Sequence, residues 1–140
     1  MTNLSNNIFV YGSLLEDFFN YNKYLKGKVL KRSYARTKGK LFHQIDKGYP
    51  AMIEGDDFVY GELLEIDDWD NTVIELDKLE NFYGEDNANN EYNRVLLQIE
   101  QLEDSSVILS FVYMYNCKDK QALEKEKYIP YGNWKTFMKR

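Results

Sequence analysis

Short apolar runs separated by turn residues are the feature that most limits how this chain can fold. The runs alternate or are rich in β-branched and aromatic residues, as strands are. Turn residues lie at Asp46 to Gly48, Gly55 to Asp57 and Glu103 to Ser105. The expected strands are Ile8 to Tyr11, Val29 to Phe42, Ala51 to Glu54, Phe58 to Ile66, Tyr92 to Glu100 and Val107 to Tyr115. The last two predict a hairpin.

Helical spacing is confined to two short stretches. Phe18, Tyr21 and Leu25 recur at three and four residues before Gly27, and a second helix is expected after the strand that ends at Ile66. About six strands with one or two helices predict an α+β fold around a curled or closed sheet. The length of 140 residues fits one domain, residues 1–140.

Charge and composition exclude several classes of function. Lysine and arginine number 18 and aspartate and glutamate 23, so the net charge of −5 disfavours a nucleic-acid partner. The nearly apolar run Val107 to Tyr115 reaches about nine residues, short of the roughly 20 that a membrane helix requires. With one cysteine and no signal segment, a cytoplasmic protein is expected.

The stretch Tyr11 to Leu14 supports two compatible interpretations. Ser13 and Glu16 have capping-box spacing, which predicts a serine N-cap and a helix that begins at Leu14. The same geometry would leave backbone N–H groups after Gly12 exposed at a helix start, where a carboxylate or phosphate binds well. The local pattern does not choose between them.

The second helix carries a candidate general base. Thr72 and Glu75 have capping-box spacing, so the helix is expected to begin at about Val73, with Gly84 just past its end. Glu80 would lie in its last turn.

Glu80 falls on the apolar side of that helix, four residues after Leu76 and seven after Val73. Partial desolvation and the negative end of the helix dipole would both raise the pKa of its carboxyl, as a general base near neutral pH requires. Alternatively, Glu80 extends to water and has no role. Asp77, one turn earlier, is a second candidate.

Other catalytic patterns are missing from the sequence. His43 is the only histidine and Cys117 the only cysteine, so the usual zinc spacing does not occur. No nucleophile elbow, P-loop or dinucleotide fingerprint is found either. We therefore expect no metal and no cofactor.

Several fragments together resemble the γ-glutamylcyclotransferase-like family, also called AIG2-like. The fragments follow the family's order between Phe9 and about Tyr115. They are Val10 to Leu14, Gly39 to Phe42, Gly48 to Ala51, Tyr60 to Leu63, Leu76 to Glu80, and Tyr92 to Arg94.

The resemblance implies a small mixed β-barrel with one or two helices. It implies an enzyme that cyclises the γ-glutamyl group of a γ-glutamyl amine or peptide to 5-oxoproline and releases a free amine, without a metal. The residues that it implies are Glu80 as the catalytic acid and base, Asp77 as its support, and Tyr11, Gly12, Ser13, Leu14, Tyr49 and Tyr113 for substrate binding.

Two departures leave the leaving amine open. Leu14 to Phe19 is more apolar and acidic than in the family, and Asn81 follows Glu80 where many relatives have glycine. The segment Tyr128 to Phe137 would either cover the pocket or cap the barrel. The alternative functions are a non-catalytic module that binds a small carboxylate, and a protein that binds a partner through the basic stretch Lys23 to Lys40.

Overall fold

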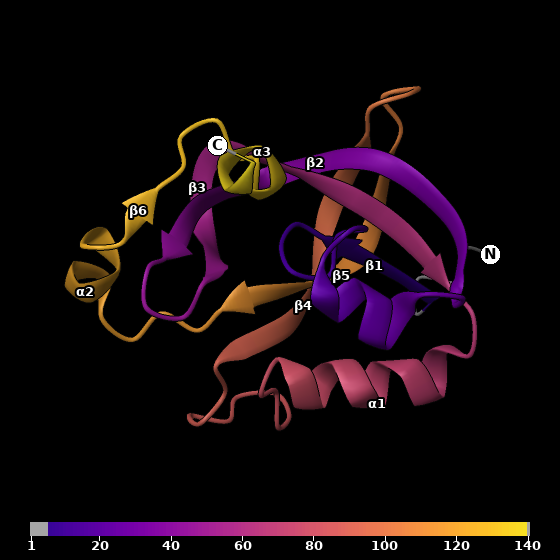
Figure 1. Ribbon diagram of the computed structural model, residues 1–140, viewed down its shortest axis with the longest axis horizontal. Helices are drawn as coiled ribbons and strands as arrows, with labels where there is room; N and C mark the ends of the chain where they lie inside the picture. Colours follow the sequence, from indigo (N-terminus) through magenta and orange to yellow (C-terminus); the bar gives the residue numbers. More distant parts are fainter. Residues whose placement is uncertain (1–5, 140) are drawn as a thin grey trace.

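The fold is a closed mixed β-barrel with few helices, as expected (Figure 1). The computed structural model describes residues 6–139. The expected absence of a signal segment concerns residues 1–5, which lie outside that range. The elements are β1 (Asn7–Val10), the π-helical turn η2 (Tyr21–Leu25), β2 (Val29–Gln44), β3 (Tyr49–Ile66), α1 (Trp69–Leu79), β4 (Tyr92–Gln101), β5 (Val107–Tyr115), α2 (Lys120–Glu124), β6 (Lys127–Tyr128) and α3 (Trp134–Met138).

The barrel closes because its two longest strands pair with each other. The strand order is β3, β1, β5, β4, β2, and β2 also pairs with β3. β1 runs parallel to β5, and the other neighbours are antiparallel. β4 and β5 form the expected hairpin.

One expected turn is instead an irregularity within a strand. Gly55 to Asp57 does not separate two strands, because β3 continues through these residues. The register shifts there: Lys38 pairs with Phe58 while Lys40 pairs with Ile53, so β3 has extra residues opposite β2. The turn residues therefore mark a bulge that helps the long strands to bend.

β1 is buried on both faces, which explains its continuous apolar sequence. Ile8 and Val10 belong to one core cluster, whereas Phe9 belongs to another. A Cβ atom on Gly61 of β3 would lie 2.1 Å from the carbonyl oxygen of Val10, so glycine permits the close approach of β3 to β1.

Two large buried clusters form most of the core, and a smaller third cluster contains Phe42, Ala51 and Leu123. One of the large clusters contains Phe9, Ala35, Val59, Ile99 and Val112, one from each barrel strand, and fills the inside of the barrel.

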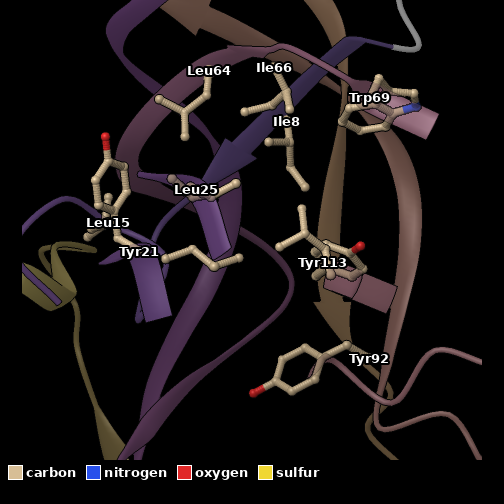
Figure 2. Close-up of a cluster of buried hydrophobic side chains, with 12 residues drawn as sticks. Ile8, Leu15, Tyr21, Leu25, Leu64, Ile66, Trp69, Tyr92 and Tyr113 are labelled. Carbon is tan, nitrogen blue, oxygen red and sulfur yellow. The ribbon is translucent and has the colours of Figure 1, made fainter. Parts of the chain in front are cut away.

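The other large cluster lies between the barrel, η2 and α1. Figure 2 shows Ile8, Leu25 and Leu64 pointing toward one another, with Tyr113 and Tyr92 to one side. Figure 1 shows α1 beneath η2, against the barrel. This outer layer holds the end of α1 close to the end of β1.

Both predicted capping boxes are wrong. α1 begins at Trp69 after Asp68, and Thr72 is buried inside the helix, where its hydroxyl donates to the Asp67 carbonyl at 3.4 Å. The helix ends at Leu79, and the first left-handed residue after it is Asn81, with φ of 53°.

The segment after β1 also differs from the expected helix. Residues 13–17 form turns, and no helix begins at Leu14. The Ser13 hydroxyl accepts a hydrogen bond from Asn20 Nδ2 at 2.9 Å and does not cap a helix. The helical spacing of Tyr21 and Leu25 corresponds to the short η2.

The C-terminal segment caps the barrel. Trp134 of α3 is buried in the cluster inside the barrel and donates from Nε1 to His43 Nδ1 at 3.0 Å. Gly132 accepts a backbone hydrogen bond from Tyr60 at 2.8 Å. Within residues 6–139, no helix combines the length and apolarity needed to cross a membrane.

Candidate active site

A cavity of about 140 Å³ lies where the ends of several elements meet. The C-terminal ends of β1 and α1, the first residues of β3 and β4, and β5 surround it. Its lining residues are Phe9, Val10, Tyr11, Gly12, Ser13, Leu14, Asn20, Tyr49, Pro50, Leu79, Glu80, Asn81, Glu91, Tyr92 and Tyr113.

Among the described residues, the carboxyl of Glu80 is the one of the cavity's two carboxyls whose pKa is raised. Glu80 is the C-cap residue of α1, and its carboxyl has no hydrogen-bond partner among residues 6–139. Burial, and then the charge of Glu91, raise the pKa of this carboxyl to about 8. A carboxyl with that pKa can both accept and donate a proton near neutral pH.

The loop after β1 presents backbone donors to the same cavity. Among the described residues, no protein acceptor is recorded for the N–H groups of Gly12, Ser13 and Leu14, whereas the Leu15 N–H donates to the Gly12 carbonyl at 2.9 Å. Unpaired N–H groups at a cavity wall suit a carboxylate or a developing oxyanion.

Close packing against Pro50 requires glycine at position 12. A Cβ atom there would lie 2.5 Å from Cγ of Pro50, so only glycine lets the loop lie directly on the start of β3. Pro50 lines the same cavity as the loop that it contacts.

Two wall tyrosines are tied to α1 through Asp77. The Tyr11 hydroxyl donates to the Tyr113 carbonyl at 2.5 Å, and the Tyr113 hydroxyl donates to Asp77 at 2.6 Å. Arg94 binds the same carboxylate through two nitrogens, at 2.9 and 3.2 Å. Asp77 is therefore a bridge between α1, β4 and β5, and it does not line the cavity.

The other two wall tyrosines also have their hydroxyl groups bound to protein. Tyr92 donates to the Pro50 carbonyl at 2.5 Å and accepts from Gln44 at 3.2 Å. Tyr49 donates to Glu91. Burial raises the pKa of both phenols, so they stay neutral and present their rings to the cavity.

All the residues predicted from the sequence for catalysis and substrate binding lie on this one cavity, while Asp77 stands behind it. The remaining lining residues were not predicted as site residues; they are Phe9, Val10, Asn20, Pro50, Leu79, Asn81, Glu91 and Tyr92. Tyr92 opens the Tyr-x-Arg fragment and Asn81 is the departure after Glu80, so both had a signal. Glu91 had none, because a charged residue before a strand is common.

The other candidate chemical groups lie elsewhere. His43 packs beside Trp134 and is not part of the cavity lining. The stretch Lys23 to Lys40 belongs mainly to β2 and contributes no cavity residue. Within the described part of the chain, no group of three or more His, Cys, Asp or Glu side chains is placed to hold a metal ion.

Known proteins have sequences similar to that of this chain. The family model described as gamma-glutamyl cyclotransferase, AIG2-like, matches residues 8–136. A curated relative from Niallia circulans is the gamma-L-glutamyl-butirosin B gamma-glutamyl cyclotransferase. It is 32% identical over 131 residues, which are 94% of this chain and 76% of that protein.

Solved structures share the fold. YkqA from Bacillus subtilis has a TM-score of 0.66 and 24% identity over 95% of this chain, which spans 40% of that protein. An AIG2-like protein from Mus musculus has a TM-score of 0.70 and 24% identity. The match covers 89% of this chain and 86% of the mouse protein chain. At these identities the likeness concerns the fold alone.

Proposed function

This chain belongs to the gamma-glutamyl cyclotransferase, AIG2-like family, and from that premise we propose that it cyclises the γ-glutamyl group of a γ-glutamyl amine or peptide. The products are 5-oxoproline and a free amine. The reaction uses protein groups alone and proceeds without a metal, on a small substrate. We place it in the cytoplasm, in keeping with the single cysteine.

One observation carries the proposal: Glu80 lines the same small cavity as Gly12 to Leu14, whose N–H groups have no acceptor among the described residues. A γ-glutamyl group has an α-ammonium and an α-carboxylate on the same carbon. The carboxylate would bind the loop N–H groups, which brings the ammonium to Glu80.

Glu80 serves as the base first. It takes a proton from the α-ammonium, and the neutral nitrogen attacks the γ-carbonyl carbon of the same molecule to form the new C–N bond. Glu80 then gives its proton to the departing nitrogen as the old C–N bond breaks, and it takes back the extra proton of the ring nitrogen. A pKa of about 8 suits both directions of transfer.

The shape of the cavity supplies the remaining assistance. A glutamyl chain must fold back on itself before its nitrogen can reach the γ-carbonyl, and a small cavity with rigid aromatic walls favours that conformer. Tyr49 and Tyr113 supply two of those walls. Their hydroxyl groups are bound to carboxylates, so we assign them packing and not proton transfer.

A mass-spectrometric screen tests the proposal. The panel contains γ-glutamyl amino acids, γ-glutamyl amines, glutathione and γ-glutamyl-ε-lysine. We expect at least one compound to yield 5-oxoproline and its free amine in equal amounts. Thermal stabilisation by a γ-glutamyl compound that yields no product would instead support the binding module.

A further inference from the structure

Glu91 is a second carboxylate on the cavity wall, and three donors bind it. Lys47 Nζ lies 3.1 Å from Oε2, and the Tyr49 hydroxyl donates to the same oxygen. Asn81 Nδ2 donates to Oε1 at 2.9 Å. These donors come from the β2–β3 turn, the start of β3 and the end of α1, so the carboxylate is fixed from three directions.

The bond to Asn81 reaches the turn that carries Glu80. Asn81 directly follows Glu80 and has φ of 53°, a left-handed conformation that asparagine tolerates better than most residues. Two backbone hydrogen bonds join the same segments. The Glu91 N–H donates to the Asn81 carbonyl at 3.1 Å, and the Tyr92 N–H donates to the Glu80 carbonyl at 3.3 Å. Glu91 thus binds this turn through its side chain and its main chain.

The bound donors keep Glu91 charged. Burial acts to raise the pKa of Glu91, but the hydrogen bonds from Tyr49, Asn81 and Lys47 outweigh it and hold the pKa below its usual value. Glu91 is therefore a carboxylate at neutral pH.

The other groups that face Glu80 are neutral or already paired. The phenols on the four elements around it have pKa values raised by burial; they are Tyr11, Tyr49, Tyr92 and Tyr113. Asp77 on the same helix is paired with Arg94. Within the described residues, Glu91 is the only other ionisable acid on the cavity lining besides these phenols, and Lys47 opposes its charge from outside the lining.

We propose that Glu91 is a positioning residue for Glu80: it fixes the turn that carries Glu80 and holds a permanent negative charge beside the Glu80 carboxyl. This inference rests on the proposed role of Glu80. In the empty site the neighbouring charge keeps a proton on Glu80. The α-ammonium of a bound substrate offsets that charge, so Glu80 releases this proton to solvent when substrate binds and is then the base that the proposed reaction requires.

Titration of Glu80 in two variants with opposite expected effects tests the inference. Glu91→Gln removes the negative charge in a side chain of the same size, and Lys47→Met removes the opposing positive charge. Carbon-13 NMR of protein labelled at the glutamate carboxyl carbon follows Glu80, whose resonance is identified by its loss in Glu80→Gln. We expect the pKa of Glu80 to fall in Glu91→Gln and to rise in Lys47→Met.

The pH profile of kcat/KM should move with the same signs. At about pH 6, a fall of one unit from a pKa of about 8 raises the ionised fraction of Glu80 roughly tenfold. An unchanged Glu80 titration in Glu91→Gln, or shifts of the same sign in both variants, would overturn the inference. The NMR titration needs no turnover, so it separates failure of this inference from failure of the proposed reaction.

Asn81→Gly tests the positioning of the turn. Glycine accepts the left-handed conformation, so this change removes the side-chain bond to Glu91 without straining the backbone. We expect kcat to fall several-fold while KM stays within about twofold, because the substrate's carboxylate still meets the loop. An unchanged kcat would contradict the positioning role.

Discussion

At the scale of single residues, the carboxyl of Glu80 should make stability depend on pH. Burial and the charge of Glu91 raise its pKa from 4.5 to about 8 in the folded protein. The folded state then binds this proton more tightly than the unfolded chain does. Its contribution to stability is complete below about pH 4.5 and is lost as the pH rises through about 8.

Glu80→Gln should remove this dependence. Relative to the wild type, we expect little difference in the free energy of unfolding near pH 4 and a gain of roughly 2 to 4 kcal/mol near pH 9. Urea denaturation of both proteins across that range measures the difference. A constant difference would mean that Glu80 titrates as an ordinary exposed glutamate.

Tyr113 should act through its ring. In Tyr113→Phe the hydrogen bond to Asp77 is lost, and we expect a destabilisation of about 1 kcal/mol. kcat should stay within about threefold of the wild type, because the hydroxyl faces Asp77 and not the cavity. Thermal unfolding and steady-state kinetics check both points, and a loss of kcat above tenfold would assign the hydroxyl a direct role.

Residues differ in how far the sequence reveals them. The three- and four-residue spacing from Val73 and Leu76 places Glu80 on the inward side of its helix, although spacing alone leaves Asp77 open. The structure separates the two, because Arg94 binds Asp77. Glu91 depends on contacts with Lys47 that join distant parts of the chain, and no local pattern encodes them.

At the scale of elements, the contact between the loop after β1 and the start of β3 shapes the cavity. Gly12→Ala would place a methyl group 2.5 Å from Pro50, so the loop must move away. We expect a destabilisation of about 1 to 3 kcal/mol and a raised KM. Thermal unfolding and kinetics test this, with Gly27→Ala as a control at a glycine outside the cavity lining, where an added methyl group meets nothing within 4 Å. Equal effects on KM in both variants would contradict the contact's role.

Helix boundaries were the least predictable part of the fold. The spacing of Thr72 and Glu75 predicted a helix start near Val73. The helix instead begins one turn earlier, at Trp69, whose ring stacks on that of Phe111 in β5 with the ring centroids 5.7 Å apart. Burial of a large ring outweighs the energy of a cap. The apolar runs that mark strands were more informative, because barrel strands bury one face, or both faces in the case of β1.

At the scale of the whole molecule, closure of the barrel joins parts that are far apart in sequence. Pairing of β2 with β3 and of β1 with β5 could not be derived from local patterns. The strand count left a curled or a closed sheet open, and the order of the family fragments favoured a barrel. Contacts between distant parts of the chain also determine where the C-terminal segment lies. The sequence therefore left open whether this segment covers the pocket or caps the barrel. Figure 1 shows α3 lying against β2 and β3, on the other side from α1.

Trp134 should matter for stability and little for catalysis. Its ring fills the inside of the barrel and does not line the cavity. For Trp134→Ala we expect a loss of about 3 to 5 kcal/mol, with kcat/KM close to the wild type at temperatures where the variant is folded. Denaturation and activity assays at low temperature check this, and a selective loss of kcat/KM would show that the segment covers the site.

The most direct measurement compares product formation by the wild type and Glu80→Gln on the best γ-glutamyl substrate. Circular dichroism establishes that both are folded, and mass spectrometry quantifies 5-oxoproline and the free amine. We expect equal amounts of both products from the wild type and a rate at least about 100-fold lower from Glu80→Gln, because acid–base assistance is lost. Turnover by Glu80→Gln at the wild-type rate would contradict the proposed role of Glu80.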